Sequence, residues 1–129
     1  MSKTKEQIVV DRICEFLKNA ICCDVDLAQA EGQDLFYVRN PKFDMFINAC
    51  NFENRDYVKI EYLQFKDRDY TFATRLVELL CDIAKIEGVS LGIWCDKDDK
   101  KSLKLYTNGG FKIIKLFNDD SYWLASNLR

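Results

Sequence analysis

The amino-acid sequence predicts an α+β fold built on a mixed, mostly antiparallel sheet of six strands. Apolar residues recur with helical spacing over about 4–20 and 71–87, whereas much of the remaining chain consists of short runs rich in β-branched and aromatic residues. Polar turn signals separate these runs. Between two predicted hairpins, the segment 57–95 has the order strand, helix, strand that is typical of a parallel βαβ unit.

The N-terminal part is expected to form one helix and one hairpin. The helix over about 4–20 is amphipathic, with charged residues between its apolar ones. The segment after it is weakly patterned, and a short helical turn is expected at Val25–Ala30. Strand-like runs at 35–39 and 43–50 flank Asn40-Pro41-Lys42, whose Asn-Pro pair is a turn signal.

The central part carries the strongest helical pattern. The run 57–65 has apolar residues on both faces and suits an interior strand. The helix at 71–87 has apolar residues at spacings of four, seven, eight and eleven from Phe72. A further strand is expected at 89–95.

The C-terminal part is expected to form a short helix and a second hairpin. Asp98 or Asp99 can cap a helix that runs to Asn108, where two glycines end it. The last strands are predicted at 111–117 and 122–128, joined by a polar turn.

Composition excludes several classes of function. The chain has no histidine, so it cannot form a Ser-His-Asp triad, a Cys-His pair or an imidazole metal site. A formal net charge of −2, with scattered lysines and arginines, argues against nucleic acid as a partner. No apolar run is long enough to span a membrane, and the start resembles an amphipathic segment rather than a signal peptide. A cytoplasmic protein without a membrane partner is therefore expected.

The length of 129 residues is typical of one domain, which is expected to span 1–129. With 48% hydrophobic residues, such a chain can fill a core without disulfides. The cysteines show no C-x-x-C spacing and are expected to be buried, reduced thiols, with no bound metal. They are Cys14, Cys22, Cys23, Cys50, Cys81 and Cys95.

Four segments, in this order, carry a family signal. Arg68-Asp69-Tyr70-Thr71-Phe72-Ala73 precedes the central helix, and Asp99-Lys100-Lys101-Ser102-Leu103-Lys104-Leu105-Tyr106 forms the short one. Gly110-Phe111 and Tyr122-Trp123-Leu124 follow. Together they resemble the GNAT superfamily of acyl-CoA-dependent N-acyltransferases over 57–128, with Thr71 where the family motif Gln/Arg-x-x-Gly-x-Gly/Ala has its first glycine.

The resemblance implies an enzyme that moves an acetyl group directly from acetyl-CoA, its co-substrate, to an amine of a protein or a small molecule. It implies no metal, and it leaves the acceptor and the oligomeric state open. Tyr106 and Glu61 match the expected catalytic positions, as general acid and as base. The expected acetyl-CoA-binding residues are Leu63, Gln64, Phe65, Arg68, Asp69, Tyr70, Thr71, Phe72, Ala73 and Asp99.

The chemistry of these residue types suits the implied roles. The start of a helix presents backbone N–H groups and a partial positive charge, which attract a pyrophosphate. A phenol such as that of Tyr106 keeps its proton at neutral pH and can donate it to a departing thiolate. A carboxylate such as that of Glu61 can accept a proton from an amine, directly or through water.

Each of these residues also has a purely structural interpretation. Tyr106 suits the inner face of a helix, Asp99 suits a helix cap, and Glu61 suits a strand surface. Cys95 is expected to act as a small hydrophobic residue, since no base is available to activate it.

An alternative function keeps the scaffold without catalysis, as a protein-binding or regulatory module. Asp69 places a negative charge where a pyrophosphate is expected, and Thr71 brings a side chain where the family has glycine. The family's first strand also has no counterpart ahead of the N-terminal helix, which predicts an open sheet edge for a partner.

Overall fold

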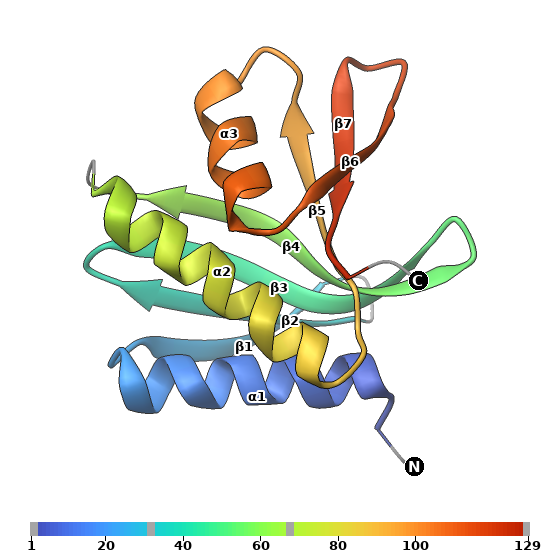
Figure 1. Ribbon diagram of the computed structural model, residues 1–129. Helices are drawn as coiled ribbons and strands as arrows, with labels where there is room; N and C mark the ends of the chain where they lie inside the picture. Colours follow the sequence, from blue (N-terminus) through green and yellow to red (C-terminus); the bar gives the residue numbers. More distant parts are fainter. Residues whose placement is uncertain (1–2, 31–32, 67–68, 128–129) are drawn as a thin grey trace. The chain divides into compact units, whose positions relative to one another are not determined.

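Helices and strands follow the order predicted from the sequence, with one additional strand. The computed structural model describes residues 3–30, 33–66 and 69–127. The chain divides into two units, Met1–Arg68 and Asp69–Arg129, which are described separately (Figure 1). We refer to them as unit 1 and unit 2.

Unit 1 begins with the predicted helix. Helix α1 spans Lys5–Ala20 and starts at a capping box, in which Thr4 Oγ1 accepts from the Gln7 backbone N–H at 3.2 Å. The Gln7 side chain accepts in return from the Thr4 N–H at 2.9 Å. The buried face of helix α1 consists of Val9, Val10, Ile13, Cys14 and Leu17.

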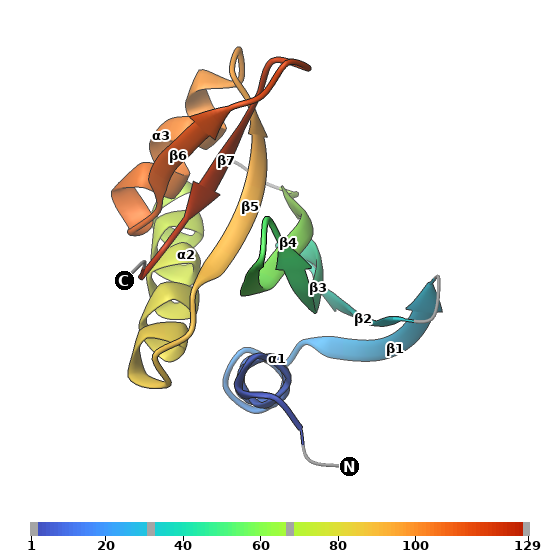
Figure 2. The same ribbon diagram turned by 90° about the vertical axis from the view of Figure 1, so that its right-hand side faces the viewer.

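Four antiparallel strands complete unit 1. They are β1 (Asp24–Ala30), β2 (Gln33–Asn40), β3 (Phe43–Phe52) and β4 (Arg55–Phe65), each paired with the next in the chain. Helix α1 covers one face of this sheet (Figure 2). The core between helix and sheet is fully apolar at the centre, with Val38, Met45 and Ile47 completely buried.

The helical turn predicted at Val25–Ala30 is wrong, because this segment is strand β1. Val25 lies directly opposite Val38 on β2, so pairing along the whole strand replaces a local turn. Cys22, with φ of 57°, turns the chain from α1 into this strand. Strand β1 stands at the end of the strand order, with β2 as its one neighbour in it, so the open edge expected as a partner surface stays a prediction.

Unit 2 contains the central helix and the C-terminal elements. They are α2 (Tyr70–Ile86), β5 (Leu91–Asp96), α3 (Lys100–Gly109), β6 (Lys112–Leu116) and β7 (Ser121–Ala125). Strand β7 pairs antiparallel with both β5 and β6, and the two helices lie on the same side of this three-stranded sheet (Figure 2). All five elements were predicted at these places.

The predicted fold class is confirmed, since the chain is α+β with a mixed, mostly antiparallel sheet. The described residues form seven strands rather than six, because of β1. No helix in the described part of the chain is long and apolar enough to cross a membrane. That the two units make one domain stays a prediction.

The cysteines are free thiols. Cys14, Cys23, Cys81 and Cys95 are buried, as predicted, whereas Cys22 is exposed and Cys50 is half-buried, which corrects the expectation for these two. Burial raises the pKa of the Cys14 thiol to about 12 and that of Cys81 to about 11, so both stay protonated and unreactive at neutral pH.

Helix α3 packs on α2 through a residue without a side chain. A Cβ atom on Gly109 would lie 2.2 Å from Val77 Cγ1. We expect Gly109→Ala to destabilise the protein by about 1–2 kcal/mol, because overpacking costs about 1–3 kcal/mol and the gain in helix propensity returns at most about 1 kcal/mol. Urea unfolding measures this change. Thr107→Ala, an exposed position on the same turn, should stay within about 0.5 kcal/mol of the wild type, and an equal effect of both variants would contradict the packing argument.

Candidate functional site

Asp69 caps the start of α2. The carboxylate of Asp69 accepts from the Phe72 N–H at 3.1 Å, and its backbone carbonyl accepts from Ala73 at 3.0 Å. Tyr70 and Thr71 are exposed in the first turn. Asp69 therefore already engages one of the N–H groups that the sequence assigned to a pyrophosphate. Arg68, assigned to the same site, lies outside the described residues.

Three of the residues singled out in the sequence meet at the start of α3. Asp99 caps this helix by accepting from the Ser102 N–H at 3.2 Å. The Cys95 thiol, at the end of β5, lies 3.9 Å from the Asp99 carbonyl oxygen. The buried ring of Tyr106 packs edge-to-face on Phe111, with ring centroids 6.0 Å apart.

The environment of Tyr106 keeps its phenol protonated. Burial raises its pKa to about 12, with further contributions from the nearby Cys95 and Asp99, while a hydrogen bond with the Ser102 side chain opposes the shift. Burial likewise raises the pKa of the Cys95 thiol to about 11. At neutral pH this cluster can donate a proton from Tyr106, but Cys95 is not a thiolate nucleophile.

A pocket of about 460 Å³ lies between α2 and α3. Its size suits part of a small-molecule ligand. Its lining includes two lysines, a hydroxyl, an amide and a phenol ring, and lysine ammonium groups can bind phosphate groups. The lining residues are Tyr70, Thr74, Lys101, Lys104, Leu105 and Asn108.

Strand β4 of unit 1 contains a β-bulge at Glu61. Ile60 lies opposite Ile47, and Tyr62 lies opposite Phe46, so Glu61 is the extra residue between two register pairs. Ile60 belongs to the buried face covered by α1. The bulge therefore turns two consecutive residues, Glu61 and Tyr62, toward the other face.

The remaining predicted residues of β4 lie near this bulge. The Glu61 carboxylate forms an ion pair with Lys59 at 2.9 Å. Leu63 and Phe65 lie on the side covered by α1, whereas Gln64 lies on the other face and accepts from the Tyr62 hydroxyl. These residues belong to unit 1, and Tyr106 and Asp99 belong to unit 2.

Sequence reasoning missed the pocket and the bulge. Lys101 and Lys104 are three residues apart on one face of α3, a spacing that indicates a shared helix surface. The apolar residues of β4 change from even to odd positions between Ile60 and Leu63. This break in the two-residue period is the signal that predicts a bulge.

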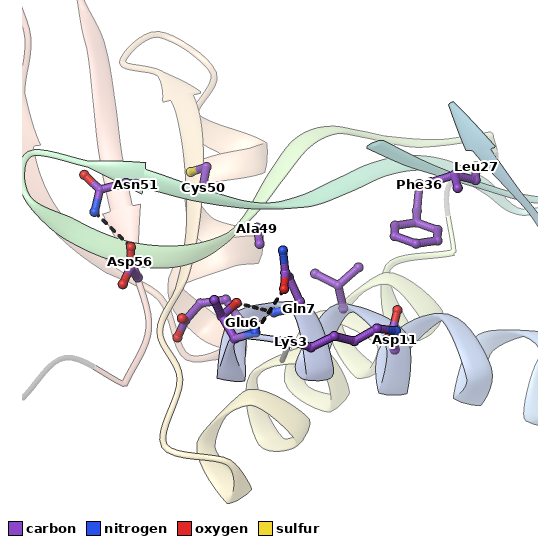
Figure 3. Close-up of a pocket in the computed structure, with 12 residues that line it drawn as sticks. Lys3, Glu6, Gln7, Asp11, Leu27, Phe36, Ala49, Cys50, Asn51 and Asp56 are labelled. Carbon is purple, nitrogen blue, oxygen red and sulfur yellow. Dashed lines mark hydrogen bonds and ion pairs between the residues drawn. The ribbon is translucent and has the colours of Figure 1, made fainter. Parts of the chain in front are cut away.

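A larger hollow of about 720 Å³ lies in unit 1, between the start of α1 and the sheet (Figure 3). Polar side chains around it pair with one another. Lys3 forms an ion pair with Asp11, and Asn51 donates to the Asp56 carboxylate at 2.9 Å. The smaller pocket of unit 2, with its two lysines, has the clearer ligand chemistry.

No protein-family model matches the sequence, and no curated protein matches it at the sequence level. Solved structures do share its fold. An acetyltransferase of Bacillus subtilis in complex with CoA is similar with a TM-score of 0.57 at 13% identity, over 83% of this chain and 99% of that one. A GNAT family acetyltransferase of Elizabethkingia anophelis with acetyl-CoA bound has a TM-score of 0.56 at 14% identity, over 82% and 98%.

A chain of the NatC complex bound to Gag peptide and CoA is also similar, with a TM-score of 0.56 at 18% identity, over 74% of this chain and 71% of that one. At such identities the likeness shows the fold, which is that of GNAT acetyltransferases. The GNAT-like fold predicted from the sequence is confirmed.

Proposed function

We propose that the chain is a divergent N-acetyltransferase that uses acetyl-CoA and an amine acceptor. The observation that carries the proposal is the pocket of unit 2, which is lined by Lys101 and Lys104 of α3 and by Tyr70 and Thr74 of α2. Two ammonium groups offset the negative charge that Asp69 brings to this end of α2.

The residues present suit the groups of acetyl-CoA. Lys101, Lys104 and Asn108 would hold its phosphates together with the first backbone N–H groups of α2, at Tyr70 and Thr71. Arg68 would add a further cation, with Phe72 and Ala73 completing the turn. Backbone groups of Leu63, Gln64 and Phe65 would hold its acyl-bearing arm.

Acetyl-CoA supplies the acetyl group as a thioester, in which the C–S bond breaks as the bond from the amine nitrogen to the acetyl carbon forms. Tyr106, whose phenol is protonated at neutral pH, donates its proton to the departing sulfur. Glu61 accepts the proton that the amine loses. Asp99 holds the start of α3 and thereby positions Tyr106.

A second candidate function is a protein-binding or regulatory module without catalysis. The Asp69 cap favours it, because this carboxylate engages the Phe72 N–H at the expected anion site. Binding of acetyl-CoA distinguishes the two functions.

Calorimetry with acetyl-CoA tests the proposal, and Asp69→Asn sharpens it. Asparagine keeps the helix cap and removes the charge. The wild type should bind, and Asp69→Asn should bind about two- to fivefold more tightly, since a charge near a helix start changes the free energy by about 0.5–1 kcal/mol.

Asp119→Asn is the matched control, because Asp119 also accepts from a backbone N–H, that of Ser121 at 3.2 Å, in the β6–β7 turn. Its affinity should equal that of the wild type. If the wild type shows no heat of binding at millimolar acetyl-CoA, the proposed transferase function is rejected and the protein-binding or regulatory module remains.

A further inference from the structure

Two of the described strands have a neighbouring strand on one side only. Strands β1 and β6 stand at the two ends of the strand order, where β1 pairs with β2 and β6 pairs with β7. Such an edge presents backbone N–H and C=O groups that can pair with a strand of another chain. The side chains along each edge decide which strand can pair with it.

The β1 edge is acidic on the sheet face turned away from α1. Asp24 and Asp26 lie on this face, opposite Arg39 and Tyr37 of β2, and both aspartates are exposed. Asp26 forms an ion pair with Arg39. A carboxylate has about four acceptor positions, so this pair leaves Asp26 able to accept a second cation. The β1 edge thus carries two carboxylates beside one guanidinium group.

The β6 edge is basic on one face. Lys112 lies opposite Ala125 and Lys115 lies opposite Trp123, and these two residues of β7 share a face because they are two positions apart. The register shift between Ile113 and Lys115 brings both lysines to this face, although they are three positions apart in the chain. All five residues of β6 are exposed. The β6 edge therefore carries a pair of lysines where the β1 edge carries a pair of aspartates.

The other face of each edge is apolar and lies on the helix side. In unit 1, Val25 and Leu27 lie on the face covered by α1, and Leu27 is 56% exposed. In unit 2, Ile113 and Leu116 share a face with Cys95, whose thiol lies beside the start of α3. Both are about half-exposed. Each edge thus has charged side chains away from the helices and exposed apolar side chains toward them.

We propose that β1 of one copy of the chain pairs with β6 of a second copy. With the covering helices of both edges on the same side of the joined sheet, the aspartates meet the lysines on one face and the apolar side chains meet on the other. Opposite charges on adjacent strands attract, whereas two β1 edges or two β6 edges would bring like charges together. The charges therefore favour this unlike pair over either symmetric dimer.

A contact between two different edges leaves a dimer with one unused β1 edge and one unused β6 edge, so further copies can join in open chains or closed rings. Sedimentation velocity should show a mass that rises above the 15.1 kDa of one chain as the protein concentration increases. Added salt should lower this mass, because it screens the charges. A mass that stays at 15.1 kDa from micromolar to millimolar protein would overturn the inference.

Charge reversal at each edge tests the pairing directly. Asp24→Lys with Asp26→Lys, and separately Lys112→Glu with Lys115→Glu, should each weaken self-association about tenfold or more, because two attractions become repulsions. Circular dichroism verifies that each variant is folded. An equal mixture of the two double variants should associate again, since opposite charges then meet at every contact between unlike variants. Unchanged association in either double variant, or no recovery on mixing, would reject the inference.

The control is Lys5→Glu with Lys85→Glu, which reverses two exposed lysines on α1 and α2. It changes the net charge as much as the reversal on β6 and should associate like the wild type. An equal loss in this control would indicate a general charge effect and contradict edge pairing. The lysines that line the pocket of unit 2 are Lys101 and Lys104. Self-association and acetyl-CoA binding are therefore tested through different residues, and failure of one proposal leaves the other in place.

Discussion

Replacing Tyr106 with phenylalanine should lower kcat by about two to four orders of magnitude, the usual contribution of a general acid. The affinity for acetyl-CoA should change little, since the hydroxyl acts on the departing sulfur rather than on the bound ground state. Steady-state kinetics together with calorimetry measure both quantities.

The pH dependence of kcat provides an independent check on Tyr106. Burial raises the pKa of this phenol to about 12, so it stays protonated well above pH 10. The wild type should therefore lose no activity through Tyr106 between pH 7 and 10. A basic limb centred near pH 10 that disappears in Tyr106→Phe would contradict the buried environment.

Tyr57→Phe is the matched control for Tyr106→Phe, because Tyr57 is also a buried tyrosine, 5% exposed on β4. It removes the same hydroxyl group from a core and should leave kcat near that of the wild type. Equal turnover in both variants would assign Tyr106 a structural role only.

Replacing Lys101 and Lys104 together with alanine should weaken acetyl-CoA binding by about one to two orders of magnitude. Each charge-assisted contact to a phosphate contributes about 1.5 kcal/mol or more, which corresponds to roughly tenfold. The wild-type affinity should also fall with rising salt, and the variant should show a smaller salt dependence, because the screened charges are gone. Calorimetry at two ionic strengths measures both effects.

The control for this double variant is Lys112→Ala with Lys115→Ala. These two lysines are likewise three residues apart and exposed, but on β6. Both double variants change the net charge by the same amount. A general electrostatic effect would therefore weaken acetyl-CoA binding equally in both. That result would contradict a specific role of the pocket between α2 and α3.

The sequence by itself determined the elements whose signals are local. The start of α3 at an aspartate cap, predicted at Asp98 or Asp99 and found at Asp99, and the end of the helix at Gly110, with φ of 125°, depend on residues within one turn of the chain. The period of α2 and the position of Tyr106 on the buried face of α3 follow from spacing alone. Such features need no distant partner.

Only the tertiary structure decided features that depend on residues far apart in the chain. Strand β1 has a weak local pattern, and its conformation follows from pairing with β2. The pocket of unit 2 exists because Gly109 lets α3 approach Val77, which brings the lysines of one helix to Thr74 of another. A sequence pattern cannot state which helix faces will meet.

The bulge at Glu61 lies between these two cases. Its signal, the shift of apolar residues from Ile60 to Leu63, is local, but its consequence is not. The bulge turns Tyr62 onto the outer face of the sheet. There Tyr62 lies opposite Phe46 on β3, which in turn lies opposite Tyr37 on β2. Strand register is set by the burial of one whole face of the sheet, and the free energy of this burial is summed over all paired strands. The sequence of a single strand therefore does not determine which aromatic rings will meet.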